Sequence, residues 1–391
     1  MKIVHFSTTH EGGAGLAARR LSHTLNLHGI DSNFYALEQP GYHPQSKELK
    51  VPRSFISKIQ SAVFLKFQSF LTLKTLFSTY SSNARSLKYF TDIGKEEDVI
   101  LHFHNWANLI SQRNLQKIIK LGFRVVITLH DQRLLTGGCH YTLDCGEVAQ
   151  ACAKCPRSSF ILRGKIRQVK SQSDLFLSLR SENLRLIAPS IWMTQSDATY
   201  SKYGRVNIFH IPNVLGPVWN IEHYSYTPRN RSSDIIVVGV ASNTQNSYVK
   251  ASEIVERLYK ESQKDSKNYR VVFLSDASYR GRHSDFWKEI DYLLALSRAD
   301  NSPNVIAEAK SLGIPVIASA VGGIPELLSE NSDFLISDND LNFAHLDTFL
   351  SAQGRTRIEV PIGEAQRNSD LKDEASIAKL ISLYESLLLE E

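Results

Sequence analysis

The chain has few cysteines, no long uncharged apolar run and no low-complexity tract. Cysteine occurs only four times in 391 residues, and all four lie between residues 139 and 155. The chain lacks an uncharged apolar run of about 18 residues, which leaves no candidate for a transmembrane helix. The amino terminus becomes polar too early for a signal peptide. We therefore expect an ordered cytoplasmic protein.

Acidic residues are scarce between Lys47 and Lys88, although the net charge of the whole chain is only +5. Within this stretch, the segment Arg53–Phe77 combines a broad apolar face with Lys58, Lys66 and Lys74. A basic amphipathic helix of this kind suits the surface of an anionic membrane. The alternative is a helix pair packed on the sheet of its own domain.

Length and patterning predict two α/β domains. A chain of 391 residues exceeds what one core usually organises. Short apolar runs alternate with helical stretches, which predicts parallel sheets with helices on both faces. A polar break from Gly216 to Ser233 separates two series of runs, so we place a domain boundary after residue 215. The expected strands are Ile3–Phe6, Phe34–Leu37, Val99–Phe103, Val125–Leu129, Leu184–Ala188, Val206–Ile211, Ile235–Val240, Val271–Leu274, Tyr292–Leu296, Val316–Ala318 and Phe334–Ile336.

Ligands of open α/β sheets bind beyond the carboxyl ends of the strands, so we expect the functional residues at those ends. Gly12, Gly13 and Gly15 follow the first strand and open a helix. Such a turn lets an anion approach backbone N–H groups at a helix amino terminus. Gly13, Gly15 and Ala18 also match a dinucleotide fingerprint. The alternative is a tight turn that only packs the helix on the strand.

Histidines end two further strands. His102 and His104 share one strand face, and Asn105 follows them, which favours an edge that faces a ligand. His130 ends the next strand, where it can donate a hydrogen bond to a hydroxyl or to a developing negative charge, with Asp131 fixing its orientation. The alternative is that these histidines are structural and bonded within the fold.

The four cysteines are Cys139, Cys145, Cys152 and Cys155. Such clustering in an intracellular protein favours a zinc site over disulfides, and four thiolates would make it structural. Free or redox-paired thiols remain the alternative.

The second domain carries two acidic residues, Asp300 and Glu308, on either side of a helix start that includes Asn301 and Asn304. The first-turn N–H groups can face an anion, while the carboxylates accept hydrogen bonds from hydroxyls. A capping Asp with a solvated Glu is the alternative. The pair Gly322 and Gly323 again follows a strand and opens a helix.

The string DNSPNVIAEAKSLGIPVIASAVGGIPE, from Asp300 to Glu326, resembles the donor-site signature of the family 4 glycosyltransferases, which are retaining enzymes with the GT-B fold. The segments EGGAG, HFHNW, TLHD, TGGCHY, APSIWM and IPN are similar to the branch that contains colanic-acid-type and other exopolysaccharide transferases. The resemblance spans most of both predicted domains.

This resemblance implies two Rossmann-like domains facing each other across a cleft. Residues 1–215 would form the acceptor domain, residues 216–369 the nucleotide-sugar domain, and residues 370–391 a helix crossing back onto the first. Catalysis would need no metal cofactor, which leaves zinc a structural role.

The resemblance also assigns roles to single residues. His130 would contact the donor sugar, Glu308 the ribose, and Asp300 would replace the first glutamate of the family pair. Lys250 would neutralise the diphosphate, and Gly13 would lie near the acceptor and the phosphates.

We therefore expect a retaining glycosyltransferase that moves a sugar from a nucleotide-sugar donor to a saccharide or lipid-linked saccharide acceptor in cell-surface polysaccharide synthesis. The glycine fingerprint leaves a nicotinamide-dependent oxidoreductase as one alternative. The cysteines and the positive charge leave a zinc-bearing nucleic-acid-binding protein as another, although no nucleic-acid motif accompanies them.

We predict one tightly held zinc ion per chain on Cys139, Cys145, Cys152 and Cys155, because four thiolates in a short loop can complete a tetrahedral site. Elemental analysis of protein purified without added metal measures it. Less than about a tenth of an equivalent, together with four titratable thiols, would contradict the prediction.

Overall fold

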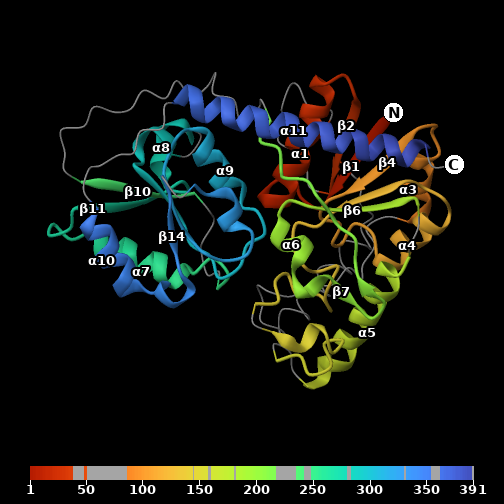
Figure 1. Ribbon diagram of the computed structural model, residues 1–391, viewed down its shortest axis with the longest axis horizontal. Coiled ribbons are helices and arrows are strands. Elements are labelled where there is room, and N and C mark those ends of the chain that lie inside the picture. Colours follow the sequence, from red (N-terminus) through yellow and green to blue (C-terminus); the bar gives the residue numbers. More distant parts are fainter. Residues whose placement is uncertain are drawn as a thin grey trace. The chain divides into compact units, whose positions relative to one another are not determined.

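The computed structural model forms two compact units (Figure 1). It describes residues 1–37, 48–50, 86–143, 145–156, 160–179, 182–216, 235–241, 248–279, 283–329, 332–353 and 362–389. Unit 1 comprises Met1–Gly216 and Glu374–Glu391, and unit 2 comprises Pro217–Asp373. The basic segment Arg53–Phe77 lies outside the described residues.

Unit 1 is built on a seven-stranded sheet in the order β3-β2-β1-β4-β5-β6-β9, in which each neighbouring pair is parallel. The strands are β1 (Lys2–Ser7), β2 (Asp31–Ala36), β3 (Glu48–Lys50), β4 (Val99–Phe103), β5 (Val125–Thr128), β6 (Leu184–Ala188) and β9 (Phe209–His210). The helices are α1 (Gly12–Leu27), α3 (Leu87–Gly94), α4 (Gln112–Lys120), α5 (Phe160–Leu177) and α6 (Ile191–Gln195), with short turns η1 (Gly146–Val148) and η2 (Asp197–Thr199).

One predicted strand of unit 1 is much shorter than expected. The run Val206–Ile211 contributes only β9 to the sheet. The backbone N–H of Val206 instead donates to Thr199 O at 3.0 Å, at the base of a small hairpin formed by β7 (Tyr200–Ser201) and β8 (Gly204–Arg205). The apolar run predicts a strand, but it does not show that the hairpin takes the N–H group of Val206 away from the sheet.

The central strands are apolar on both faces because layers of helices cover both. Phe6, Leu101 and Ile127 point into one core with side chains of α3, α4 and α5. Their neighbours Ile100 and Val126 point into the opposite core with α1. Alternating residues therefore serve two cores, which accounts for the continuous apolar runs.

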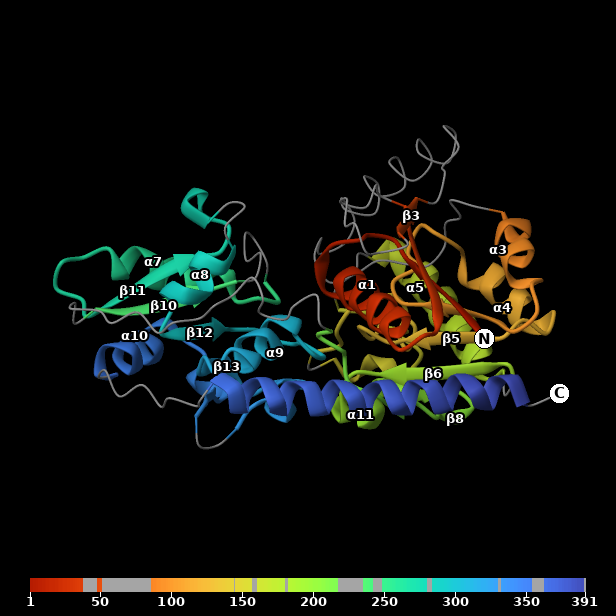
Figure 2. The same cartoon turned by 90° about the horizontal axis from the view of Figure 1, so that it is seen from above.

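Helix α11 (Ile362–Leu389) completes the second of these cores. The predicted helix, residues 375–389, is its carboxyl-terminal part, which lies along the sheet of unit 1 (Figure 2). The Tyr384 hydroxyl is hydrogen-bonded to His102 Nδ1 at 2.8 Å, and Arg124 Nε donates to Leu387 O at 2.9 Å. The buried apolar side chains of this helix in the core are Ile377, Leu380, Leu383 and Leu387.

Unit 2 is a parallel five-stranded sheet in the order β11-β10-β12-β13-β14. Its strands are β10 (Ile236–Val240), β11 (Tyr269–Phe273), β12 (Tyr292–Ala295), β13 (Val316–Ser319) and β14 (Phe334–Ile336). Its helices are α7 (Ser252–Ser262), α8 (His283–Glu289), α9 (Asn304–Ser311) and α10 (Phe343–Ala352), with short turns η3 (Ala277–Tyr279), η4 (Ile324–Leu327) and η5 (Asp338–Asp340). Of the helices within the described ranges, none is both long and apolar enough to cross a membrane.

We predict that Tyr384→Phe lowers the free energy of unfolding by about 1–3 kcal/mol, because it leaves the buried His102 Nδ1 without its partner. Urea denaturation followed by circular dichroism measures the loss. Tyr203→Phe is the control, since the Tyr203 side chain is exposed. Equal losses in the two variants would contradict the prediction.

Candidate active site

Strands β1, β4 and β5 are neighbours in the sheet of unit 1, so the residues that follow them meet at one edge. The glycine turn, His104 and His130 all lie there. The turn serves the first of the purposes considered above, packing, and anion binding stays a prediction. A Cβ at Gly15 would overlap the carbonyl oxygen of Thr9, so Gly15 is required for packing. Gly12 and Gly13 are exposed and have open space around them, so an anion can approach their backbone.

His130 is half-buried at this edge, and its Nε2 lies 3.1 Å from His104 Nδ1. Burial lowers the pKa of His130 to about 4. The imidazole is therefore neutral at pH 7 and carries a single N–H group. It can donate one hydrogen bond to a ligand without adding positive charge.

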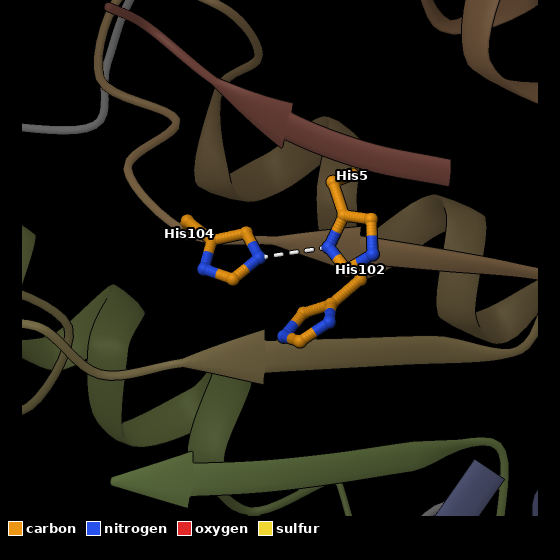
Figure 3. A group of neighbouring side chains, drawn as sticks. All are labelled: His5, His102 and His104. Atoms are coloured by element: carbon orange, nitrogen blue, oxygen red, sulfur yellow. Dashed lines mark hydrogen bonds between the residues drawn. The ribbon is translucent and has the colours of Figure 1, made fainter. Parts of the chain in front are cut away.

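His104 itself is buried rather than facing the surface. Its Nε2 lies 3.0 Å from His5 Nδ1, and His102 lies beside both rings (Figure 3). His102 and His104 are only 0% and 3% exposed, so the alternative that they are bonded within the fold is correct for both residues. His104 can act on a ligand only through His130.

Asp131 does not orient His130, contrary to our interpretation of the sequence. Its carboxylate accepts from Arg133 Nε at 2.9 and 2.8 Å, and Arg133 Nη2 donates to Asn105 Oδ1 at 3.1 Å. Although burial raises the pKa of Asp131, the Arg133 guanidinium holds that pKa below its ordinary value. The pair Asp131–Arg133 thereby anchors Asn105 beside the glycine turn, where Thr8 N donates to Asn105 O at 2.6 Å.

In unit 2, Lys250, Asp300 and the Gly322–Gly323 pair converge at the carboxyl ends of β10, β12 and β13. Lys250 Nζ forms an ion pair with the Asp300 carboxylate. Gly323 N donates to Asp300 O at 3.0 Å. A Cβ at Gly322, whose φ is +59°, would overlap that same carbonyl oxygen. Only glycine therefore allows this approach.

The alternative of a capping Asp and a solvated Glu is wrong. Asp300 binds Lys250, and the residue that caps α9 is Pro303, which forms no side-chain cap. Glu308 lies on α9 and is only 8% exposed. Asn301 is buried with it, and Asn304 begins the helix. A buried carboxylate needs hydrogen-bonding or charged partners, so Glu308 belongs to the folded interior of unit 2 and is not a solvated surface residue.

A family described as glycosyl transferases group 1 matches residues 227–347. The Escherichia coli (strain K12) protein WcaC, named as a colanic acid biosynthesis glycosyl transferase, is 25% identical over 364 residues, which cover 87% of this chain and 88% of WcaC. Sucrose-phosphate synthase from Thermosynechococcus elongatus has a similar structure, with a TM-score of 0.63 and 15% identity over 100% of both chains. Anabaena Alr3699/HepE in complex with UDP-glucose has a TM-score of 0.60 and 13% identity, covering 98% of this chain and 99% of that one.

The chain is a glycosyltransferase with the GT-B fold. The expected fold class is thereby confirmed. These comparisons support neither the oxidoreductase nor the nucleic-acid-binding alternative.

The cysteines of the glycosyltransferase do not form a closed cage in this structure. Among the described histidine, cysteine and acidic side chains, only His5, His102 and His104 bring three ligand atoms within 4.8 Å of one another. Cys139, Cys152 and Cys155 are buried and Cys145 is half-buried, and none of these four described residues forms a disulfide. Burial raises the pKa of Cys152 to about 11, which favours its thiol. Zinc binding by the four cysteines stays a prediction.

Two residues of the glycosyltransferase were missed by sequence reasoning. In the sequence His5 is simply one residue of the first apolar run, and no motif marks Arg133. A signal existed for His5, because a histidine inside a buried parallel strand needs a polar partner. That partner, His104, is 99 residues away, so the pair could not be read from spacing.

We predict that Gly322→Ala lowers the unfolding free energy of this glycosyltransferase by at least about 2 kcal/mol, because its Cβ would overlap the Asp300 backbone at a positive φ. Chemical denaturation measures the loss. Gly164→Ala is the matched control, since Gly164 is exposed and a Cβ there meets open space. Similar stabilities for the two variants would show that the turn can relax.

Proposed function

We propose that this glycosyltransferase transfers a sugar, with retention of configuration, from a nucleoside diphosphate sugar to a saccharide or lipid-linked saccharide acceptor in cell-surface polysaccharide synthesis. One observation carries the proposal: the convergence of Lys250, Asp300 and Gly322 at the carboxyl edge of the sheet of unit 2. Lys250 lies 50 residues before Asp300, whereas Asp300 and Gly322 both belong to the donor-site signature, and their convergence forms a charged site beside the glycine turn.

The diphosphate of the donor is the ligand that suits this site. Lys250 is paired with Asp300, so a bound diphosphate would compete with the carboxylate for the ammonium group. The Lys250 charge and the N–H groups at the start of α9 would then stabilise the negative charge that develops on the leaving diphosphate. In this proposal Glu308 binds the ribose hydroxyls.

In the proposed reaction the bond between the anomeric carbon and the diphosphate oxygen breaks as the acceptor hydroxyl attacks from the same face. The new glycosidic bond forms there, and the hydroxyl proton passes to the departing diphosphate. His130, which is neutral at pH 7, would donate a hydrogen bond to the donor sugar. No metal enters this scheme, because Lys250 and backbone N–H groups carry the neutralising charge.

The relatives agree with this chemistry. Anabaena HepE has been solved with UDP-glucose, and WcaC is named for colanic acid biosynthesis. A lipid-linked acceptor would also give the basic segment Arg53–Phe77 a purpose, namely peripheral docking on an anionic membrane. The nucleotide and the sugar are to be found by screening UDP-, GDP- and ADP-sugars for hydrolysis and for a rise in melting temperature.

We predict that Glu308→Ala and His130→Ala each reduce transfer by at least about a hundredfold, because each removes a contact to the reacting donor. The assay uses the nucleotide sugar that the screen identifies. The matched controls are Glu256→Ala and His345→Ala, which alter exposed side chains of the same types. Initial rates and melting temperatures are measured for all four. Near-native transfer by either site variant would refute the assignment of that residue.

A further inference from the structure

Three imidazoles form a continuous chain from the interior of unit 1 to its carboxyl edge. His5 Nδ1 lies 3.0 Å from His104 Nε2, and His104 Nδ1 lies 3.1 Å from His130 Nε2. His5 and His104 are 0% and 3% exposed, whereas His130 is half-buried. The inner link joins β1 to the end of β4 (Figure 3).

A metal ion is the first alternative, because ring nitrogens of His5, His102 and His104 lie within 4.8 Å of one another. The hydrogen bonds argue against it. His102 Nδ1 is bonded to the Tyr384 hydroxyl and His102 Nε2 to Thr128 Oγ1, both at 2.8 Å. Both nitrogens of His104 are bonded as well, so two of the three rings have no lone pair left for a metal.

Each ring in the chain is neutral at pH 7. Burial lowers the pKa of His5 to about 3 and that of His104 well below its usual range. A neutral imidazole has one N–H donor and one bare nitrogen acceptor. Every link needs one donor and one acceptor, so all three N–H groups must point along the chain in the same direction.

The inner end of the chain decides that direction. His5 Nε2 is buried, and none of the described residues offers it a hydrogen-bond partner. If the proton were on Nε2, an N–H donor would be buried without an acceptor, which is the rarer and costlier defect. With the proton on Nδ1, His5 donates to His104, and His104 Nδ1–H donates to His130 Nε2. The proton of His130 must then lie on Nδ1.

We propose that His5 and His104 are positioning residues that hold the proton of His130 on Nδ1, so that this N–H group is presented to the sugar donor. The inference rests on the proposed function of His130 and deepens it. It gives His104 a role other than direct contact with the acceptor. It also explains why two polar rings are retained in an apolar core, since the outer ring alone could adopt either tautomer.

The tautomer can be read directly in the unaltered protein. Two-bond ¹H–¹⁵N correlation spectra of protein labelled with ¹⁵N-histidine distinguish Nδ1–H from Nε2–H, and His130→Asn identifies the signal of His130. We expect Nδ1–H at His130 and at His5. An Nε2–H tautomer at His130 would overturn the proposal. So would one equivalent of bound metal that is lost in His104→Asn and retained in Cys145→Ser.

Two substitutions of equal size test the consequence for transfer. In His104→Asn the amide can still donate to His130 Nε2, whereas in His104→Asp the carboxylate can only accept and forces the proton of His130 onto Nε2. We expect kcat of the Asp variant to be at least about tenfold below that of the Asn variant, as a wrong histidine tautomer is strongly inhibitory. Equal kcat values, or a faster Asp variant, would overturn the proposal.

His102→Asp is the control for burying a charge. His102 lies in β4, two residues before His104, and both of its ring nitrogens bond groups outside the imidazole chain, namely Tyr384 and Thr128, so the His130 tautomer should not change. If the Asp variants do not fold, the spectrum of the unaltered protein still decides. The proposed function and the proposed role of the imidazole chain fail separately. An Nδ1–H tautomer at His130 with no sugar transferred would refute only the proposed function. Sugar transfer with an Nε2–H tautomer at His130 would refute only the role of the imidazole chain.

Discussion

Burial of parallel strands between two apolar layers is the constraint on which the rest of this structure depends. β1, β4 and β5 are covered on both faces, so a polar side chain within them must find its partner inside the fold. His5 and His104 satisfy each other in this way, and His102 binds Tyr384 and Thr128. The same parallel arrangement places every strand end at one edge, which is where the outer ring, His130, reaches solvent.

Unit 2 uses the same constraint for a different chemistry. β13 is followed by a backbone turn at Gly322, whose close approach to the Asp300 carbonyl is possible only with glycine. The carboxylate of the same residue holds Lys250, so one aspartate links three neighbouring strand ends. Under the proposed function this pairing suits the binding of a diphosphate, since the exchange of one anion for another does not require the ammonium group to be buried unpaired.

Helix α11 shows how far a local pattern can be read. Its apolar stripe predicted a helix, and the family resemblance predicted that it returns to the first domain. Its position on the sheet of unit 1 is fixed by the hydrogen bond between Tyr384 and His102, which lies 282 residues earlier in the sequence. Amphipathic periodicity identifies the buried face of a helix, but the surface that it covers is decided by the whole fold.

The sequence by itself determined the α/β class, most of the strands, the glycine turns and the donor signature, because periodicity and turn chemistry are local properties of a few neighbouring residues. It also singled out His130, Lys250, Asp300 and Glu308 through motifs. Only the tertiary structure decided that Asp131 binds Arg133 rather than His130 and that His104 is buried. It also decided that the ring of His5 is bonded to that of His104. These outcomes depend on side chains brought together across the sheet, and sequence spacing carries no information on such long-range partners.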